Sequence, residues 1–244
     1  MINTKIFFYA MMFMVLITHS RAQDFTANNN IDTTTRIDTG GEFRIEGSFT
    51  VGAGLKQLTV GKTTDNVDVT MSGGGGMSGM IGFDYGINSS IEFNAAGGYQ
   101  YSSLVPQVKN AKGSFSRIIF LTGLKYTIPI ASSNLLKIGG GFGYYIPGDL
   151  DVDISSVSGG GHNIYSYDGN AGFHFSCEYE MFDASNLSWG MGLKFYTVSY
   201  DLKSLTSNGV PYPINLLSQT VKDQTMKLDG SGIDLTVFIV LGLL

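Results

Sequence analysis

Three polar residues in one segment could carry nucleophilic or acid–base chemistry. His174, Ser176 and Glu178 alternate with apolar residues, so on a β-strand their side chains would share one face. A catalytic triad needs hydrogen bonds of about 2.6–3.2 Å. Residues i and i+2 of a strand lie about 6.6–6.8 Å apart, so one strand cannot bring these three together. The sequence therefore predicts no catalytic residues and no enzyme.

Three acidic residues farther up the chain could bind a metal ion. Asp149, Asp151 and Asp153 alternate in a polar connection, and Ca²⁺ prefers oxygen ligands of this kind. The spacing lacks the glycine and the terminal glutamate of an EF-hand loop. A solvated acidic loop is the favoured interpretation and a Ca²⁺ site is the alternative. No cofactor is expected.

Charged residues also recur on one face of several predicted strands, opposite bulky apolar side chains. Both signs occur among them, and charges removed from water need partners of opposite sign. The pattern therefore predicts an ionic network inside a narrow lumen, and a conducting or proton-linked pore is the alternative. The predicted members are Glu42, Arg44, Glu46, Asp84, Glu92, Arg117, Lys125, Lys137, Glu178, Glu180, Lys194 and Asp234.

The elements that would position these charges are strands with a period of two. In segment 169–181, Phe173, Phe175 and Cys177 alternate with polar residues, which gives one apolar and one polar wall. Eight segments show this alternation: 41–55, 77–85, 91–101, 115–128, 136–146, 169–181, 189–200 and 233–243. Short connectors, 86–90, 129–134 and 183–186, alternate with long polar ones, 56–72, 102–114, 148–166 and 201–229.

The bulky apolar wall predicts a membrane barrel. An eight-stranded barrel has an interior that side chains fill, so the polar, glycine-rich face fits the lumen and the bulky face fits lipid. Aromatic residues gather near both ends of the strands, as in the interfacial girdles of such barrels. The predicted interfacial aromatics are Tyr85, Tyr126, Trp189, Tyr99, Tyr101 and Tyr144, joined by Phe43, Phe93, Tyr167 and Tyr200. The expected fold is all-β, a closed antiparallel up-and-down transmembrane β-barrel of eight strands.

The N-terminal residues predict export. Lys5 precedes an apolar run without charge, and Ser20-Arg21-Ala22 ends in small residues of the kind that a signal peptidase reads. The expected organisation is a signal peptide over 1–22, a polar, disordered lead-in over 23–40 and the barrel over 41–244. Cleavage removes two of the 15 basic residues and none of the 20 acidic ones, which leaves 13 − 20 = −7. Nucleic acid is therefore excluded as a partner.

In its alternation and loop rhythm, the segment 41–244 resembles small Gram-negative outer-membrane β-barrels of the OmpA/OmpX type and porin-like families. The resemblance implies a place in the cell outer membrane. It also implies contact with outer-membrane lipid and lipopolysaccharide, and insertion by the barrel-assembly machinery. The favoured function is a non-enzymatic barrel with a salt-bridged, closed lumen and a structural, adhesive or protective role. A small-solute, porin-like channel is the alternative, followed by a lipid-modifying barrel enzyme and a periplasmic ligand-binding barrel.

Overall fold

A computed structural model describes residues 39–243 apart from 64, 132, 157–159 and 185. The predicted signal peptide over 1–22 lies outside the described residues, as does the predicted lead-in except for Thr39 and Gly40. The text below concerns the described part of the chain.

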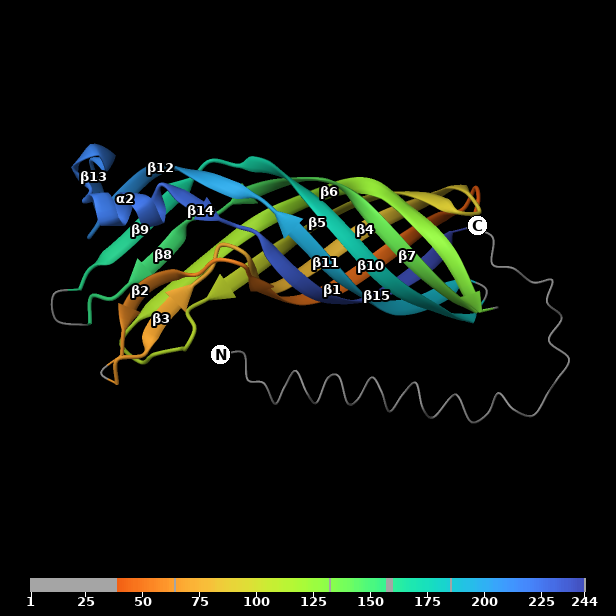
Figure 1. Cartoon of the computed structure of the whole chain (residues 1–244), viewed down its shortest axis with the longest axis horizontal. Helices are drawn as coiled ribbons and strands as arrows, with labels where there is room; N and C mark the ends of the chain where they lie inside the picture. Colours follow the sequence, from red (N-terminus) through yellow and green to blue (C-terminus); the bar gives the residue numbers. More distant parts are fainter. Residues whose placement is uncertain (1–38, 64, 132, 157–159, 185, 244) are drawn as a thin grey trace, which may run out of the picture. The chain divides into compact units, whose positions relative to one another are not determined.

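Eight antiparallel strands form a closed barrel (Figure 1). Each strand pairs with its neighbours in order, and the last pairs with the first from Gly232 opposite Gly54 to Leu243 opposite Phe43. This closure confirms the predicted fold class. The barrel strands are β1 (Phe43–Gly54), β4 (Gly75–Asn88), β5 (Ile91–Ser103), β6 (Lys112–Ala131), β7 (Asn134–Pro147), β10 (Asn170–Ala184), β11 (Leu187–Thr197) and β15 (Gly232–Leu243).

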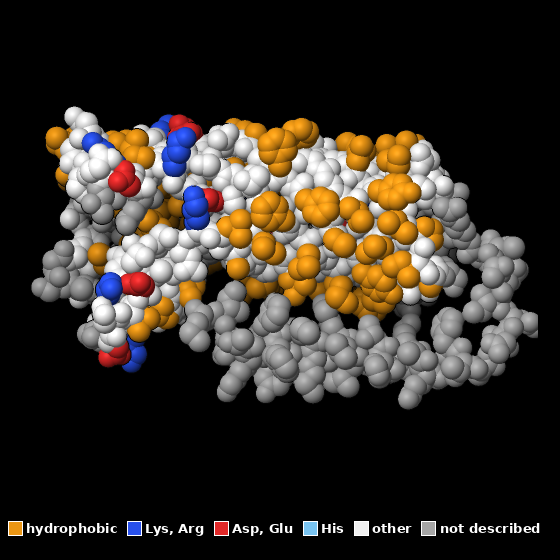
Figure 2. All heavy atoms as spheres, in the orientation of Figure 1, with side chains coloured by type: hydrophobic (Ala, Val, Ile, Leu, Met, Phe, Trp, Pro, Cys, Tyr) orange, Lys and Arg blue, Asp and Glu red, His pale blue; other side chains and the backbone are white. Residues whose placement is uncertain are grey.

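The apolar wall of each strand faces outward. On β10, Phe173 and Phe175 are 60% and 54% exposed, whereas Ser176, the next residue along the strand, is buried. Cys177 is also exposed on this outer wall. Figure 2 shows the outward apolar side chains spread over the barrel with almost no charge among them. A surface of this kind requires an apolar surrounding, because exposed apolar area in water is costly.

Three short turns join the strands at one end of the barrel, which is called the turn end here. They connect β4 to β5, β6 to β7 and β10 to β11. Asn88 explains the first of them, because its side-chain Oδ1 accepts hydrogen bonds of 2.9 Å from the backbone N–H groups of Ser90 and Ile91. Asparagine favours turns for this reason. β1 begins and β15 ends at this same end.

The opposite end, called the loop end, differs from the prediction of polar loops. Its long connections fold into an extension of the barrel, in which β8, β9 and β12 continue the wall above β6 (Figure 1). The elements of the extension are β2 (Leu58–Lys62), β3 (Asp68–Met71), β8 (Leu150–Asp153), β9 (His162–Tyr167), β12 (Ser199–Ser207), β13 (Val210–Tyr212), η2 (Ile214–Leu216), α2 (Gln219–Thr225) and β14 (Lys227–Asp229). No helix in the described ranges is long and apolar enough to cross a membrane.

An apolar core fills the extension and reaches into the upper lumen. Val69 and Met71 of the β2–β3 hairpin meet Leu104, Leu150 and Val152 in one buried cluster. These residues alternate with polar ones over stretches of only four residues or fewer. Such stretches are too short to reveal a buried face in the sequence. The connections that the sequence predicts only as long and polar therefore form a packed structure with an apolar core of its own.

We expect Phe175→Asp and Leu235→Asp each to impair insertion into bilayers far more than His174→Ala. Both apolar side chains lie on the outward wall, and a charge on the lipid face costs up to about 2–4 kcal/mol for Arg or Lys at the midplane and less for Asp. Heat-modifiable gel mobility measures the folded fraction. Equal tolerance at all three positions would show that the walls are assigned the wrong way round.

Candidate functional site in the barrel lumen

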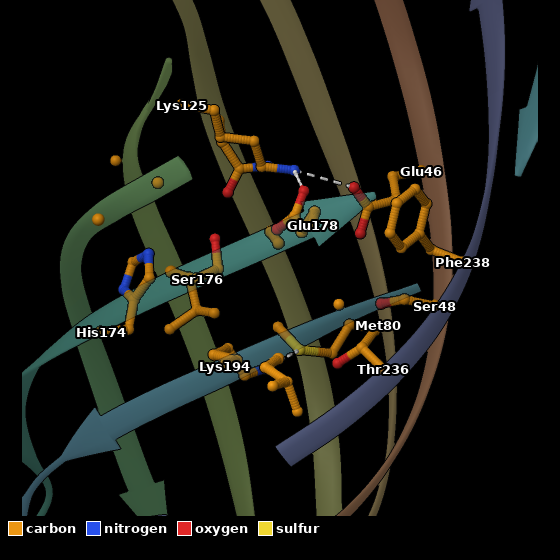
Figure 3. Close-up of a pocket in the computed structure, with 18 of the residues that line it drawn as sticks. Glu46, Ser48, Met80, Lys125, His174, Ser176, Glu178, Lys194, Thr236 and Phe238 are labelled. Carbon is orange, nitrogen blue, oxygen red and sulfur yellow. Dashed lines mark hydrogen bonds and ion pairs between the residues drawn. The ribbon is translucent and has the colours of Figure 1, made fainter. Parts of the chain in front are cut away.

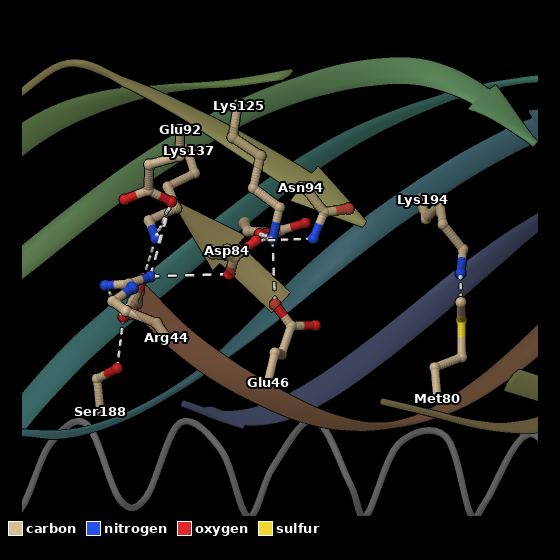
Figure 4. Close-up of polar contacts among 12 residues, drawn as sticks. Arg44, Glu46, Met80, Asp84, Glu92, Asn94, Lys125, Lys137, Ser188 and Lys194 are labelled. Atoms are coloured by element: carbon tan, nitrogen blue, oxygen red, sulfur yellow. Dashed lines mark hydrogen bonds and ion pairs between the residues drawn. The ribbon is translucent and has the colours of Figure 1, made fainter. Parts of the chain in front are cut away.

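Arg44 lies at the centre of an ionic network near the turn end of the lumen (Figure 4), and its closest acidic partner is Glu180. β1 and β10 direct these side chains inward from opposite parts of the wall. The guanidinium donates two hydrogen bonds, Nη1 to Oε1 at 3.1 Å and Nη2 to Oε2 at 3.2 Å. The Ser188 hydroxyl donates another to the same carboxylate. Arg44 is 3% exposed and Glu180 is 0% exposed, so this bidentate pair is almost fully removed from water.

Lys137 and Glu92 complete an alternating set of charges around that pair. The Lys137 Nζ lies 2.7 Å from Glu92 Oε2 and 2.5 Å from Glu180 Oε2. Arg44 Nη2 lies 3.6 Å from the Glu92 carboxylate. Arg44 and Lys137 therefore each contact both Glu92 and Glu180, and each of these two acids contacts both cations. Because Glu92 comes from β5 and Lys137 from β7, their contact passes over β6 and ties separated strands together.

Lys125 organises a second group of charges next to the first. Its Nζ lies 2.9 Å from Glu178 Oε2, 3.1 Å from Glu46 Oε2 and 3.6 Å from Asp84 Oδ1. Asn94 donates a 2.7 Å hydrogen bond to the same Asp84 oxygen. Asp84 also lies 3.9 Å from Arg44 through its other oxygen, which joins the two groups. The result is one continuous network across the lumen.

The network carries more acid than base. Three cations, Arg44, Lys125 and Lys137, contact five carboxylates, which gives 3 − 5 = −2 if all are ionised. The two least buried carboxylates are Glu46 and Glu178, at 15% and 14% exposure. Both border the cavity described next, where water can solvate the excess negative charge.

A small cavity of about 50 Å³ lies in the middle of the lumen (Figure 3). A cavity needs about 10–15 Å³ for each water molecule, so this one holds a few waters and no larger solute. Its wall is mixed, with acidic, basic and hydroxyl groups beside apolar ones. Among the residues that line it are Glu46, Ser48, Met80, Lys125, His174, Ser176, Glu178, Lys194, Thr236 and Phe238.

His174, Ser176 and Glu178 border this cavity together. The structure shows no hydrogen bond among the three, and the His174 Nδ1 has no hydrogen-bond partner among the described residues. Glu178 instead contacts Lys125. A nucleophile needs a base within hydrogen-bond reach, so this arrangement supports no triad chemistry.

Arg117 closes the lumen above the cavity, in surroundings that the sequence did not suggest. The guanidinium carbon lies 4.7 Å from the centre of the Tyr196 ring and 5.1 Å from that of Tyr145. Its Nε donates to Gln100 at 2.7 Å. Its Nη1 donates to the Tyr200 hydroxyl at 3.0 Å and to the Gly230 carbonyl at 2.7 Å. Cation–π contacts of this kind grow stronger when desolvated.

The prediction that Arg117 belongs to the ionic network was therefore wrong. No acidic side chain of the described chain lies within ion-pair distance of its guanidinium. The guanidinium instead lies in a cage of the Tyr145 and Tyr196 rings. Its Nε and Nη1 donate to neutral oxygens of Gln100, Tyr200 and Gly230 rather than to a carboxylate. Tyr145 and Tyr196 are buried at inward positions of β7 and β11, and the alternation of these strands in the sequence indicates the same facing.

The remaining predicted network residues fall into two groups. Lys194 and Asp234 lie between the cavity and the Arg117 cage, with Nζ and Oδ2 3.6 Å apart, and Lys194 also approaches the Met80 sulfur at 3.5 Å. Glu42 is exposed where the chain enters β1 and has no ion-pair partner in the described ranges. Its inclusion in the lumen was wrong, because the strand reaches the barrel interior only at Arg44.

The three candidate calcium ligands do not converge. Asp149 accepts a hydrogen bond from Ser166, and Asp151 pairs with His162 at 2.8 Å. Asp153 accepts from Ser155 at 2.6 Å. Within the described residues, no group of three or more acidic, histidine or cysteine side chains could hold a metal ion. The geometry of these residues therefore gives the Ca²⁺ alternative no support.

The predicted interfacial aromatics lie mostly on the outer wall. Among them, the exposed tyrosines are Tyr85, Tyr126, Tyr99, Tyr101 and Tyr144. Trp189 is partly exposed. Tyr167 and Tyr200 were placed in the girdle wrongly, because both are buried in the core of the extension.

Comparison with solved structures identifies the fold. The chain aligns with the outer membrane protein OprG from Pseudomonas aeruginosa at 12% identity and a TM-score of 0.58, over 84% of this chain and 97% of that one. It aligns with the outer membrane protein AlkL, solved in DMPC lipid bilayers, at 11% identity and a TM-score of 0.53, over 88% of this chain and 96% of that one. No protein-family model and no curated protein matches the chain. The chain thus has the fold of small outer-membrane barrels.

We expect Arg44→Ala to lower the midpoint of urea unfolding clearly, because it strands the buried carboxylates of Glu180 and Glu92. Removing one partner of a buried ion pair costs about 3–5 kcal/mol. Lys56→Ala is the matched control, since Lys56 makes a single 3.4 Å contact with Asp229 and is well exposed. An unchanged midpoint for Arg44→Ala would contradict the role assigned to the network.

Proposed function

We propose that this chain is a non-enzymatic, non-conducting barrel of the outer membrane and that its role resides in the external extension. The role would be structural, adhesive or protective. Outer-membrane lipid and lipopolysaccharide would cover the outward apolar wall, and the barrel-assembly machinery would insert it. The turn end would face the periplasm, because short turns on that side and long connections outside are the usual arrangement of such barrels.

The observation that carries this proposal is the filling of the lumen at two levels. The ionic network crosses it near the turn end, and the Arg117 cage with the apolar core crosses it near the loop end. The two layers are built from different interactions, so no single change of protonation or packing removes both. Between the two layers, the described residues leave a cavity of about 50 Å³.

A small-solute channel is the second candidate, and the polar wall of that cavity is what favours it. A solute path would run through the cavity and would require both layers to move. Each layer is held by contacts that cross the lumen rather than by neighbours on one strand. The closed barrel is therefore the better supported of the two functions.

We expect the refolded protein to give no stable current steps in a planar bilayer at neutral pH. The filled lumen leaves no continuous aqueous path through an eight-stranded barrel. A conducting porin reconstituted in the same bilayers serves as the positive control. Steady current steps from pure protein would overturn the closed-barrel proposal in favour of the channel.

A further inference from the structure

The wall of the barrel has a step near the loop end. β5 ends at Ser103, which lies opposite Ser114 of β6. β6 begins earlier, at Lys112, and there it pairs with β8 on its other side. Above Ser114, the edge of β6 that faces β5 therefore has no strand partner among the described residues. The loop 104–111 runs beside this open edge and encloses a cleft of about 510 Å³.

The floor of the cleft is the outward face of the extension. Asp151 and Asp153 alternate with Leu150 and Val152, which are buried in the apolar core, so both carboxylates point outward. Lys112 lies opposite Asp153 in the sheet register. His162 lies opposite Asp153 on the other side and bonds Asp151.

The carboxylates of the floor are held in place as hydrogen-bond acceptors. Asp153 accepts from the Ser155 hydroxyl at 2.6 Å and from its backbone N–H at 3.0 Å. These bonds lower the pKa of Asp153 below its ordinary value. The Asp151 Oδ1 lies 2.8 Å from His162 Nε2, which leaves its second oxygen free to accept from a ligand.

The rest of the lining adds donors, an aromatic ring and the apolar side chains of Leu104, Val108 and Ala111. Gln107 of the loop carries an amide, and Lys112 carries an ammonium group with three donors. Tyr101 borders the cleft at the top of the outward aromatic girdle and is exposed. The cleft thus presents acceptors, donors and a flat apolar surface within a volume in the range of small-molecule sites, about 300–1,000 Å³.

These features together select one class of ligand. The two carboxylates disfavour an anion, and the polar floor disfavours a purely apolar molecule. A neutral sugar has hydroxyl groups that both donate and accept, and a C–H face that packs on an aromatic ring. We propose that the cleft formed by loop 104–111 with β6 and β8 binds a neutral saccharide. The proposal rests on the proposed function, since it supplies a ligand for the external extension.

In the bound state, the sugar would stack one face against Tyr101. Its hydroxyl groups would donate to Asp151 and Asp153 and accept from Lys112 and Gln107. Hydrogen bonds to charged groups are stronger than neutral ones, so the carboxylates should contribute most of the binding.

The test uses the mature chain refolded in a detergent without a sugar headgroup, so that the detergent does not compete. The probes are maltose, lactose and chitobiose, titrated by calorimetry. We expect at least one to bind, and Asp151→Asn with Asp153→Asn to weaken its affinity by at least about tenfold, as expected from lost charge-assisted bonds. Ser114→Phe, which fills the cleft from its floor, should abolish the heat of binding.

Asp201→Asn is the matched control, because Asp201 is an exposed carboxylate outside the cleft lining. It lies 3.9 Å from the Lys227 Nζ. The Asp201→Asn variant should bind the sugar with the same affinity as the unmodified chain. Failure of all three sugars to bind, or equal affinity of the Asp151/Asp153 and Asp201 variants, would overturn the proposal. Dextran sulfate should not compete, and competition by it would contradict a neutral ligand.

A second arm separates the two sources of such a sugar. Neutral oligosaccharide fragments of lipopolysaccharide, freed of phosphate and acidic sugars, would compete with the disaccharide if the natural ligand belongs to the same membrane, and would fail to compete if the sugar is external. Conductance is measured on the same preparations. A conducting barrel that still binds sugar would overturn only the closed-lumen function, and a closed barrel that binds none would overturn only the saccharide site.

Discussion

The pairing of β15 with β1 is the constraint on which the rest of the structure depends. An unpaired strand edge in hydrocarbon leaves backbone groups without partners, at several kcal/mol each. Twelve residue pairs join the first strand to the last and remove both edges. Once the sheet is closed, the alternation of side chains along each strand fixes their environment. Every second side chain faces the surroundings, and the others share one narrow interior.

That narrow interior explains why the lumen charges are paired so completely. Eight strands enclose a space that side chains fill, so Arg44, Lys125 and Lys137 cannot keep their hydration and must find carboxylates across the barrel. The Arg117 cage solves the same problem differently, with ring faces and neutral oxygens in place of acids. The lumen is thus filled by ion pairs at one end and by the Arg117 cage at the other, because the neighbouring side chains differ at the two ends. Near the turn end the neighbours are charged, whereas near the loop end the apolar core would leave a carboxylate poorly solvated.

The barrel could be predicted from the sequence because its signal is local. Period-two alternation over nine or more residues defines a strand and both of its faces, and it placed Arg44, Glu92 and Glu180 on the inner wall. The extension gave no comparable signal. Val69, Leu104 and Leu150 pack together from three separate connections, and contacts between connections leave no periodic pattern in any one of them. Glu42 was misplaced for a related reason, since alternation fixes a face but does not say where the barrel begins.

The extension also explains why a specific surface can exist on this molecule at all. The outer wall of the barrel must stay apolar for lipid, and the lumen is filled, so neither can present a polar site to the outside. Above the membrane both restrictions end. There the strands have unequal lengths, and the first two residues of β6, Lys112 and Gly113, have no partner on the β5 side. The apolar core beneath β8 holds Asp151 and Asp153 rigidly on the other face of the sheet. The same packing that closes the barrel at its loop end thus orders the polar surface of the extension.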